Sequence, residues 1–578
     1  MEPLIAPKND KNNAQPIRND INGKTIPEEA STINLAKEWA EPKLHEHAPR
    51  ERKGARLSTI RTLLEVFSDL CSDIAGKKHY QRYFERNDRL RRLAGQIFLL
   101  GNVGWGLLYI AWFASVINWD VWYVSVPFWF AEMVGLLTST YFAIIIWYPR
   151  YHRPEGIGWN STPSVDVFIT TCGEPVNVLQ RTITAARQID YPKKRLYVLD
   201  DAASPAVKML AEHSGCHYIA RADHSHAKAG NLNYGLSQTR GEFVLVLDAD
   251  QVPDRDILEK LVNYFKFPDL AFVQSAQRFV LPEGDPFGNS DELFYKVMQP
   301  GKDNDNAAFS CGSGVIYRRA ALESIGGFSS WNLVEDVHTS MNLHAKGWKS
   351  IYHNYPLTTG TAPADIHSVY KQRQQWATDS LRLLFWDNPF KYTGLSLKQK
   401  LQYVQVGFVY LVAGFAMPVY FLIPSWSLFT GNFLANAPVL DYAFYRGLYF
   451  LFTLLALTIL EHPADSRKPY KIWAGLFPIF IKATITALRS KSQKPRYVVN
   501  GKLPDNPRLM QRLRAIVPQM SIILLTIVSI VYSLELKTLS TELFLVNALW
   551  GSWVIWSLSA ICSAAVKRKQ FARNIDPA

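Results

Sequence analysis

Cysteine is scarce in this sequence, and the few cysteines are not grouped. The five among 578 residues stand far apart, with no CxxC pair and no histidine cluster: Cys71, Cys172, Cys216, Cys311 and Cys562. A structural zinc site needs closely spaced Cys or His ligands, and a disulfide framework needs paired cysteines, so the sequence predicts neither. The scarcity fits a chain kept in a reducing compartment.

The beginning of the chain lacks the form of a secretory signal. Its first residues, MEPLIAPKNDKNN, do not pass from a basic segment into an apolar one. We therefore expect the chain to begin in the cytosol. Residues 1–92 are polar and basic, with one amphipathic stretch near 60–67, and we expect them to form a mostly flexible region.

The hydropathy is too low for a chain that lies wholly inside a bilayer. Mean hydropathy is −0.06, although 48% of the residues are hydrophobic and 13% are aromatic. A sizeable soluble domain joined to membrane spans would give this mixture. The net charge of +13 favours one of three partners: nucleic acid, an anionic membrane surface or a phosphorylated substrate.

Long apolar runs occur in two groups, one on each side of a less apolar middle. Six runs come close to or exceed the roughly 20 residues needed to cross a bilayer. They are 93–117, 121–148, 403–426, 443–460, 515–532 and 543–566. Arginines flank the first pair, which places both ends of this tight hairpin on the cytoplasmic side. An even number of spans brings both termini to the cytosol.

Much of the positive charge lies beside these runs. The segment 461–514 contains SRKPYK and RSKSQKPRYVVNGK, and the tail after the last run contains KRKQFAR. Cytoplasmic placement of both would set them against anionic headgroups. Contact with the membrane surface therefore explains most of the excess positive charge, and no nucleic-acid partner is predicted.

The middle of the chain, from about residue 151 to 399, has a soluble α/β pattern. Short β-rich runs alternate with helical patterns. The runs are 166–171, 195–200, 242–248 and 270–277, and the helical patterns are 176–189, 206–213 and 256–265. Such alternation predicts a mostly parallel sheet covered by helices on both faces. Ligands bind at the carboxyl ends of strands in these sheets, where the acidic residues of this segment lie.

Four polar clusters follow one another in this segment. They are Asp200-Asp201, Asp248-Ala249-Asp250, Glu335-Asp336 and Gln372-Arg373-Gln374-Gln375-Trp376. A single aspartate after a strand is more often a cap or a turn residue. Asp248 and Asp250 are more informative, because two carboxylates one residue apart offer the hard oxygen ligands that a divalent cation on a diphosphate requires. A separate carboxylate at Asp336 could deprotonate an acceptor hydroxyl.

The order and spacing of these clusters resemble the cellulose synthase-like members of glycosyltransferase family 2, which carry a D, D, D, QxxRW pattern. Three further segments are similar to motifs of that family: HAKAGNLN at 226–233, FSCGSG at 309–314 and YVVNGK at 497–502. The resemblance runs from about residue 165 to 376 and returns after 489. It implies a cytosolic α/β GT-A (Rossmann-like) glycosyltransferase domain and an α-helical transmembrane bundle of about six spans.

The resemblance also implies a role for each matched residue. Asp336 would be the general base, with Glu335 beside it. The nucleotide sugar would be bound by Thr171, Glu174, Asp200, Asp201, Lys228, Asp248, Arg373, Tyr497 and Lys502. Asp248 and Asp250 would hold Mg²⁺ or Mn²⁺. Cys311, Gln372 and Trp376 would line the acceptor end and the channel entrance, although Cys311 fits a small buried apolar residue as well and Trp376 fits packing at the membrane surface.

Some positions depart from the family pattern. Gln375 stands where QxxRW has arginine, so a cation expected near the diphosphate is missing. The compensating cation would be Arg373, Arg496 or Lys502. Val334 and Asn500 each stand where the family has threonine, and only two spans precede the catalytic segment. No pattern of a cyclic-di-GMP-binding PilZ domain follows the last span, so product and regulation are not expected to match cellulose synthase in full.

The resulting domain prediction has six parts. They are a cytosolic basic region (1–92), a transmembrane hairpin (93–148), a GT-A domain with interfacial helices (149–400), two spans (401–461), an interfacial helix with a gating-loop-like segment (462–514), and two spans with a basic tail (515–578).

The predicted function is an inverting, processive glycosyltransferase of the plasma (inner) membrane. It would polymerise a cellulose-like, curdlan-like or mixed-linkage β-glucan from UDP-glucose at the cytosolic face and translocate it. The expected partners are the UDP-sugar donor, the growing polysaccharide, membrane lipids and accessory subunits. Two alternatives stay open: a non-processive glycolipid glucosyltransferase, and a transporter or non-catalytic subunit with a decayed nucleotide site, for which Gln375 is the sole support.

Overall fold

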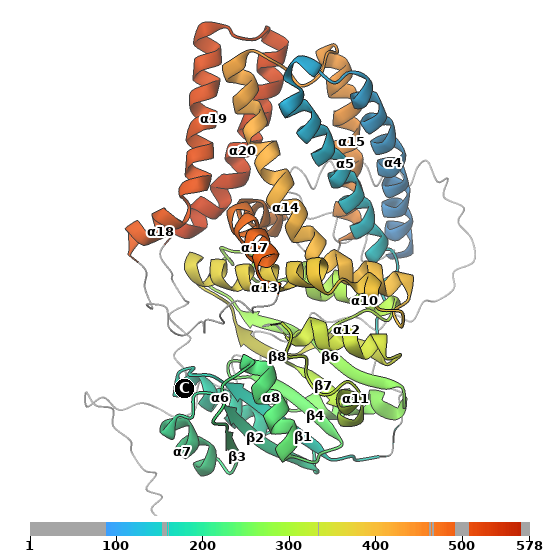
Figure 1. Cartoon of the computed structure of the whole chain (residues 1–578), viewed down its shortest axis with the longest axis vertical. Coiled ribbons are helices and arrows are strands. Elements are labelled where there is room, and N and C mark those ends of the chain that lie inside the picture. Colours follow the sequence, from blue (N-terminus) through green and yellow to red (C-terminus); the bar gives the residue numbers. More distant parts are fainter. Residues whose placement is uncertain are drawn as a thin grey trace, which may run out of the picture. The chain divides into compact units, whose positions relative to one another are not determined.

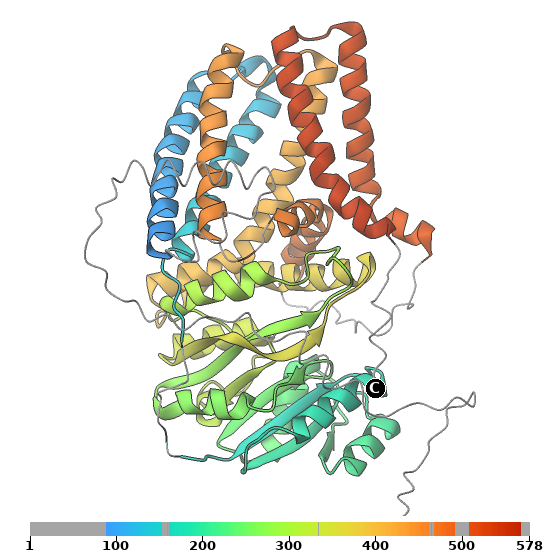
Figure 2. The same ribbon diagram turned by 180° about the vertical axis from the view of Figure 1, so that it is seen from behind.

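The computed structural model describes residues 88–152, 159, 161–332, 335–461, 464, 467–491 and 508–567. All of them belong to the same structural unit. Part of the predicted N-terminal region and all of the YVVNGK segment lie outside the described residues. Figures 1 and 2 show a sheet domain and a helical bundle from opposite sides.

An eight-stranded mixed sheet forms the centre of the soluble domain, in the order β3-β2-β1-β4-β7-β6-β8-β5. The strands are β1 (Val165–Thr171), β2 (Lys194–Asp200), β3 (His217–Ala220), β4 (Phe243–Asp248), β5 (Val252–Pro253), β6 (Leu270–Val280), β7 (Val315–Arg318) and β8 (Lys349–Thr361). The first four in the order are parallel, as is the pair β6 and β8, whereas β7 and β5 are antiparallel to their neighbours. Six of the eight strands therefore run in one direction, as the mostly parallel prediction requires, and β7 and β5 run against them.

Helices cover both faces of the sheet, as predicted. Alternate residues of β1 point to opposite faces. Val167 and Ile169 pack with α6 (Val176–Arg187), α7 (Pro205–His213) and α9 (Ile257–Val262). Phe168 packs on the other face, with α8 (Ala227–Gln238), α11 (Arg319–Ser324) and α12 (Glu335–Ala345). With apolar side chains buried on both faces, the functional groups are left to the strand ends.

The carboxyl ends of three parallel strands meet at one edge. In their register Thr171 lies opposite Asp200, and Thr170 lies opposite Asp248. Strand β7 starts opposite Val246, so the loop before it, residues 309–314, reaches the same edge. The sheet thus gathers the predicted motifs from β1, β2, β4 and β7.

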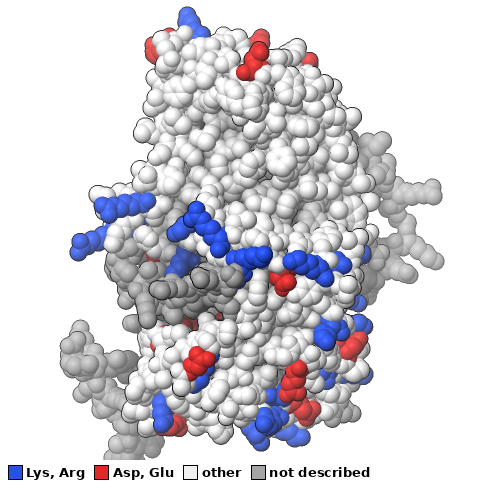
Figure 3. Space-filling model, viewed as in Figure 1, with Lys and Arg blue, Asp and Glu red and all other residues white. Residues whose placement is uncertain are grey.

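Six helices are long and apolar enough to cross a membrane. They are α4 (Asp88–Ser115), α5 (Trp122–Ile145), α14 (Leu397–Thr430), α15 (Val439–Leu460), α19 (Val517–Leu536) and α20 (Thr541–Val566). Each overlaps one of the six predicted runs. The pair α16 (Arg467–Gly475) and α17 (Phe477–Arg489), bent by 53°, would pass the same test if counted as one span. In the face shown in Figure 3 the bundle carries few charged groups, and lysines and arginines gather in a band beside it, as lipid contact requires.

Two helices lie between the sheet and the bundle (Figure 1): α13 (Ile366–Trp386) and α10 (Gln299–Asn304). Helix α13 packs on α14 and α17. In α10, the Pro300 carbonyl accepts from the Arg150 backbone N–H at 2.8 Å, and Lys302 Nζ donates to the Gln402 carbonyl of α14 at 2.8 Å. A Cβ on Gly301 would lie 2.3 Å from the Ile145 carbonyl oxygen of α5. Only glycine allows this approach, which attaches the soluble domain directly to two spans.

Candidate active site

A lysine and three carboxylates meet above the carboxyl ends of β1 and β4. Lys228 Nζ lies 2.6 Å from Asp248 Oδ1 and 3.4 Å from Glu335 Oε1. The charge of Asp336, next to Glu335, also acts on Lys228. Asp248 ends β4, Lys228 lies in the first turn of α8 and Glu335 begins α12. The fold therefore brings three of the sequence motifs into one site.

The loop 309–314 reaches this group of charges because it contains glycine. Gly312 has φ of +77°, and a Cβ on it would lie 3.1 Å from Lys228 Nζ and 3.2 Å from Asp336 Oδ2. The Gly312 carbonyl accepts a hydrogen bond from Lys228 Nζ at 2.7 Å. A side chain at 312 would strain the backbone and enter the space between lysine and carboxylate.

Buried glutamines hold the same loop in place. Gln274 Oε1 accepts from the Cys311 backbone N–H at 2.7 Å, and Gln277 Nε2 donates to the Ser313 carbonyl at 2.8 Å. Gln299 of α10 donates to the Phe309 carbonyl at 2.8 Å. The glutamines satisfy backbone groups that a buried loop would otherwise leave unpaired. None of them was singled out in the sequence, since an isolated glutamine carries no pattern.

Burial and neighbouring charges change the acidity of the site. Desolvation, and then the charge of Glu335, raise the pKa of the Asp336 carboxyl, which makes it a stronger base once ionised. Burial, and then the charges of Asp248 and Glu174, raise the pKa of Asp250 to about 7. Burial lowers the pKa of Lys228, but Asp248 and Glu335 outweigh it and raise that pKa above the usual value. Lys228 is therefore cationic and compensates part of a surplus of negative charge.

The loop after β1 brings two more predicted residues to this edge. Glu174 Oε2 accepts from the Thr171 hydroxyl at 2.7 Å and from the Cys172 backbone N–H at 2.6 Å. Because the charge of Glu174 acts on Asp250, the predicted nucleotide and metal residues are neighbours.

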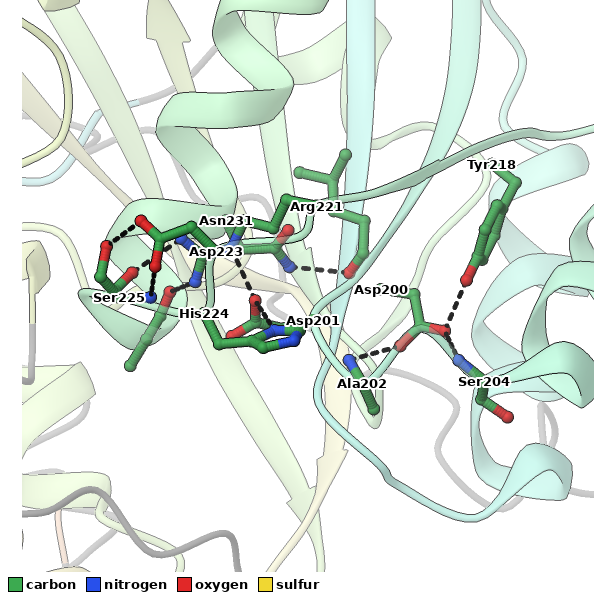
Figure 4. Close-up of polar contacts among 12 residues, drawn as sticks. Asp200, Asp201, Ala202, Ser204, Tyr218, Arg221, Asp223, His224, Ser225 and Asn231 are labelled. Carbon is green, nitrogen blue, oxygen red and sulfur yellow. Dashed lines mark hydrogen bonds and ion pairs between the residues drawn. The ribbon is translucent and has the colours of Figure 1, made fainter.

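The two aspartates after β2 differ in their contacts (Figure 4). Asp200 is fully buried and accepts from the backbone N–H groups of Ala202 and Ser204, at 2.9 and 2.7 Å, and from the Tyr218 hydroxyl at 3.0 Å. Asp201 pairs with Arg221 Nε at 2.6 Å. Asp200 therefore shapes the loop after β2.

Arg221 links Asp201 to the start of α8 (Figure 4). Its guanidinium donates to the Ser225 carbonyl at 2.7 Å and to the Ala227 carbonyl at 3.0 Å. His226 and Ala227 have positive φ of 65° and 46°, a costly conformation for non-glycine residues. Arg221 holds this turn and thereby places the following lysine. Sequence reasoning missed Arg221, because a buried arginine five residues before a motif has no periodic signal.

The predicted acceptor residues lie on α13. The Arg373 guanidinium lies 4.8 Å from the centroid of the Trp376 ring, and its Nη2 donates to Asp291 Oδ1 at 2.8 Å. The charge of Arg373 is thus neutralised by Asp291, which the sequence analysis did not single out. Gln372 and Trp376 are half-buried on the same helix.

Cys311 lies near the carboxylate of Asp336. Burial, and then the charge of Asp336, raise the pKa of its thiol. The thiol is therefore protonated at neutral pH and acts as a small contact group. Tyr497 and Lys502, with Val334, Arg496 and Asn500, lie outside the described residues.

Asp248 and Asp250 fit a divalent-cation site in the number and kind of their ligand atoms. In the described part of the chain, no group of three or more His, Cys, Asp or Glu side chains could hold a metal ion by itself. Mg²⁺ commonly takes only one or two protein carboxylates and completes its shell with phosphate and water. Two carboxylates with surplus negative charge fit that kind of site, with the remaining ligands coming from a diphosphate.

Two protein families match parts of the chain. Residues 163–378 match the glycosyltransferase like family 2, and residues 324–464 match cellulose synthase. Among curated relatives, the cellulose synthase 1 catalytic subunit [UDP-forming] of Komagataeibacter xylinus is 28% identical over 81% of this chain and 66% of its own length. Cellulose synthase 1 of Novacetimonas hansenii is 34% identical over 58% of this chain and 23% of its own length. The chain thus spans less than two thirds of the length of these relatives.

Solved structures show a weaker likeness. A mannosyltransferase from Pyrobaculum calidifontis, in complex with GDP-Man and Mn²⁺, has a TM-score of 0.46 and 18% identity, covering 64% of this chain and 100% of that chain.

The sheet, the acidic strand ends and the family match together define a glycosyltransferase domain of the GT-A class, here joined to helices that can cross a membrane. The chain is similar to the cellulose synthase-like proteins of glycosyltransferase family 2.

Proposed function

We propose that this chain is an inverting, processive glycosyltransferase that extends a β-glucan with glucose from UDP-glucose. The observation that carries the proposal is the meeting of Lys228, Asp248, Glu335 and Asp336 at the carboxyl edge of the sheet. A cation beside carboxylates can bind a diphosphate, and a separate buried carboxylate can act as base. The named activities of the relatives, cellulose synthases, agree with this chemistry.

Each residue of the site would have a defined task. Asp336 takes the proton from the acceptor hydroxyl, whose oxygen attacks the anomeric carbon while the bond from that carbon to the diphosphate breaks. A single displacement inverts the α-linked donor and gives a β linkage. Lys228 would offer a compact positive charge to the departing diphosphate. Asp248 and Asp250 would hold Mg²⁺ or Mn²⁺, which neutralises charge on the leaving nucleotide when bound.

The acceptor end would lie along the loop 309–314 and α13. Cys311 lies near the base, and Trp376 presents an indole on which a sugar ring could stack. The stacked Arg373 and its partner Asp291 would fix the orientation of that indole. In this proposal the loop after β1 and Asp201 bind the nucleotide, and Tyr497 and Lys502 complete that site.

The membrane arrangement completes the proposal. The catalytic domain and both termini would be cytosolic, in the plasma (inner) membrane, and the bundle would carry the product outward. Support comes from the six apolar helices and from the attachment of the soluble domain to α5 and α14.

The decisive experiment supplies radiolabelled UDP-glucose and Mg²⁺ to membrane vesicles that contain the full chain. We expect an ethanol-insoluble product that a β-glucanase digests, and chelation of the cation should abolish it. Label that is wholly extracted into organic solvent would contradict polymerisation and identify a non-processive glycolipid glucosyltransferase. An Asp336→Asn variant should be inactive. If this variant matched the unaltered protein, the proposed base would be wrong.

A further inference from the structure

A cavity outside the candidate active site is lined mainly by basic side chains. It opens on the soluble domain at the amino ends of β2 and β3, and its volume is about 350 Å³. Figure 1 shows α7 and β3 at the end of this domain away from the helical bundle. The lining residues are Arg187, Lys194, Arg195, His217, Leu196, Ser214 and Gly215.

The end of α6 accounts for two of the cations. Carbonyl groups at the end of a helix are stabilised by a nearby cation. Arg187 lies in the last turn of α6, and Lys194 Nζ donates to the carbonyl of Ile189, just after that helix. Arg195 and His217 lie on strands and have no such role, so the local structure does not explain their presence in the cavity.

Carboxylates of the described chain do not neutralise the arginines of the cavity. The lining contains no Asp or Glu, and within the described residues neither Arg187 nor Arg195 forms an ion pair. Of the acidic residues in the neighbouring turns, Asp190 pairs with Arg255 at 3.1 Å, and Glu212 lies outside the lining. Like charges without counterions repel one another, so an anion in the cavity would be stabilised.

An aromatic stack forms part of the same cavity. The ring of His217 stacks on the ring of Tyr197, with centroids 5.0 Å apart and planes inclined by 24°. The two residues are partners in the register of β2 and β3. Tyr197 is 8% exposed, whereas His217 is exposed. Tyr197 therefore covers one face of the His217 ring, and the other face is available to a further flat ring.

A nucleotide matches both features of the cavity. A nucleobase can stack on the free face of His217, and its phosphate can pair with the guanidinium of Arg195. The Ser214 hydroxyl can bond to the ribose or the phosphate. A volume of about 350 Å³ is at the small end of ligand cavities, which favours a nucleoside monophosphate over a larger nucleotide. A sugar phosphate would use the arginines and leave the aromatic ring without a partner.

The two strands that begin at the cavity end at the candidate active site. β2 ends at Asp200, directly before Asp201, and β3 ends at Ala220, directly before Arg221. Asp201 and Arg221 form the ion pair of 2.6 Å that joins the far ends of these strands. A ligand that holds β2 and β3 together at one end therefore acts on elements that position the pair at the other end.

We propose that this cavity is a regulatory site for a nucleoside monophosphate, separate from the donor site. The phosphate is bound by Arg195, with Arg187 and Lys194 beside it, and the base stacks on His217. Binding at the cavity changes the affinity for the donor through β2 and β3. The effect on the donor rests on the proposed function, whereas the binding of the nucleotide does not.

The first test is a calorimetric titration of the full chain in lipid nanodiscs, with UDP and Mg²⁺ at saturating concentration. The probes are AMP, adenosine and inorganic phosphate. Adenosine and phosphate should each bind roughly tenfold more weakly than AMP, since each lacks one of the two contacts. Arg195→Gln should raise the Kd for AMP about tenfold by loss of a charge-assisted bond. His217→Ala should raise it as well, whereas His217→Phe keeps a flat ring and should bind AMP nearly as well as the unaltered protein.

Lys193→Gln is the matched control. Lys193 is exposed and precedes Lys194 directly, but it does not line the cavity. Its removal takes away the same charge from the same turn, so the Kd for AMP should stay unchanged. Equal Kd values for AMP and phosphate would mean a site for anions only and would overturn the nucleotide assignment. An unchanged Kd in Arg195→Gln would place AMP elsewhere and overturn the site.

The second test measures the coupling between the two sites. The Kd for AMP is compared with and without UDP, and the KM for UDP-glucose is compared with and without AMP. Coupling free energies between sites predict a change of about fivefold or more in the unaltered protein, which Arg195→Gln should abolish. A change that persists in Arg195→Gln would show that AMP competes at the donor site, and no change would overturn the regulation. Failure of the unaltered protein to release UDP would contradict the proposed function instead, while the AMP titration would still decide whether the site exists.

Discussion

Replacement of Lys228 by methionine would remove the positive charge that lies among Asp248, Glu335 and Asp336. Two charge-assisted hydrogen bonds would be lost, to Asp248 and to the Gly312 carbonyl. Each such bond contributes about 1.5–3 kcal/mol in the absence of screening. The Asp248 side chain is 36% exposed, so water weakens the first of them. In the proposed reaction the same charge would bind the departing diphosphate, and a loss of about 3 kcal/mol of transition-state stabilisation corresponds to a fall of roughly a hundredfold in kcat/KM.

The Lys228→Met variant should also change the pH dependence of the rate. The base must be ionised, so the rate rises as pH rises through the pKa of Asp336. The charge of Lys228 lowers that pKa, against burial and Glu335, which raise it. Without the lysine the pKa of Asp336 moves up, and the rise in rate should occur at higher pH than in the unaltered protein.

The assay is the initial rate of UDP release by the solubilised full chain across the neutral and alkaline range. Lys208→Met is the matched control, because Lys208 is exposed and pairs only loosely, at 3.9 Å, with Glu212. Its profile should equal that of the unaltered protein. A Lys228→Met profile with an unchanged midpoint, or one moved to lower pH, would refute the electrostatic account of the site.

Three further variants test the surroundings of the site. Arg221→Lys should raise KM for the donor about tenfold, since two charge-assisted bonds to the turn before α8 are lost, whereas the exposed Arg240→Lys should leave UDP release unchanged. Gly312→Ala should lower kcat far more than Gly326→Ala. Both positions have positive φ, but only a Cβ at position 312 would lie against the charged groups. Equal losses of kcat in the two variants would mean that backbone strain alone is responsible. Arg373→Lys should shorten the product several-fold by loss of the planar stack on the indole, as measured by gel filtration of labelled product, and unchanged length would count against that stack.

The strands of the sheet could be predicted where apolar runs alternate with helical patterns, and not elsewhere. β1, β2, β4 and β6 are rich in apolar residues, and their observed ends lie within three residues of the expected ones. β7 has four residues directly after a glycine-rich loop, too few for a pattern. β8, KSIYHNYPLTTGT, is long but polar, because it lies toward one edge of the sheet and is only partly buried. The antiparallel direction of β7 follows from tertiary pairing, which no local pattern encodes.

The site was predictable as a set of motifs and not as a set of contacts. Asp248 and Asp336 stand out because they occur in ordered clusters. The partners that hold the motifs, Arg221 and Asp291, do not, because their pairing joins residues about 20 and 80 positions apart and their burial removes any surface pattern.

The short helix α10 contacts both the loop 309–314 of the candidate site and the helical bundle. Gln299 of α10 donates a hydrogen bond to the Phe309 carbonyl in the loop near Asp336. Lys302 of α10 donates a hydrogen bond to the Gln402 carbonyl in the first turns of α14. With only six residues, α10 has no interior to absorb a displacement at either end. In the proposed reaction, a shift of the loop 309–314 would therefore be passed through α10 to α14, so that movements at the site and in the bundle would be coupled.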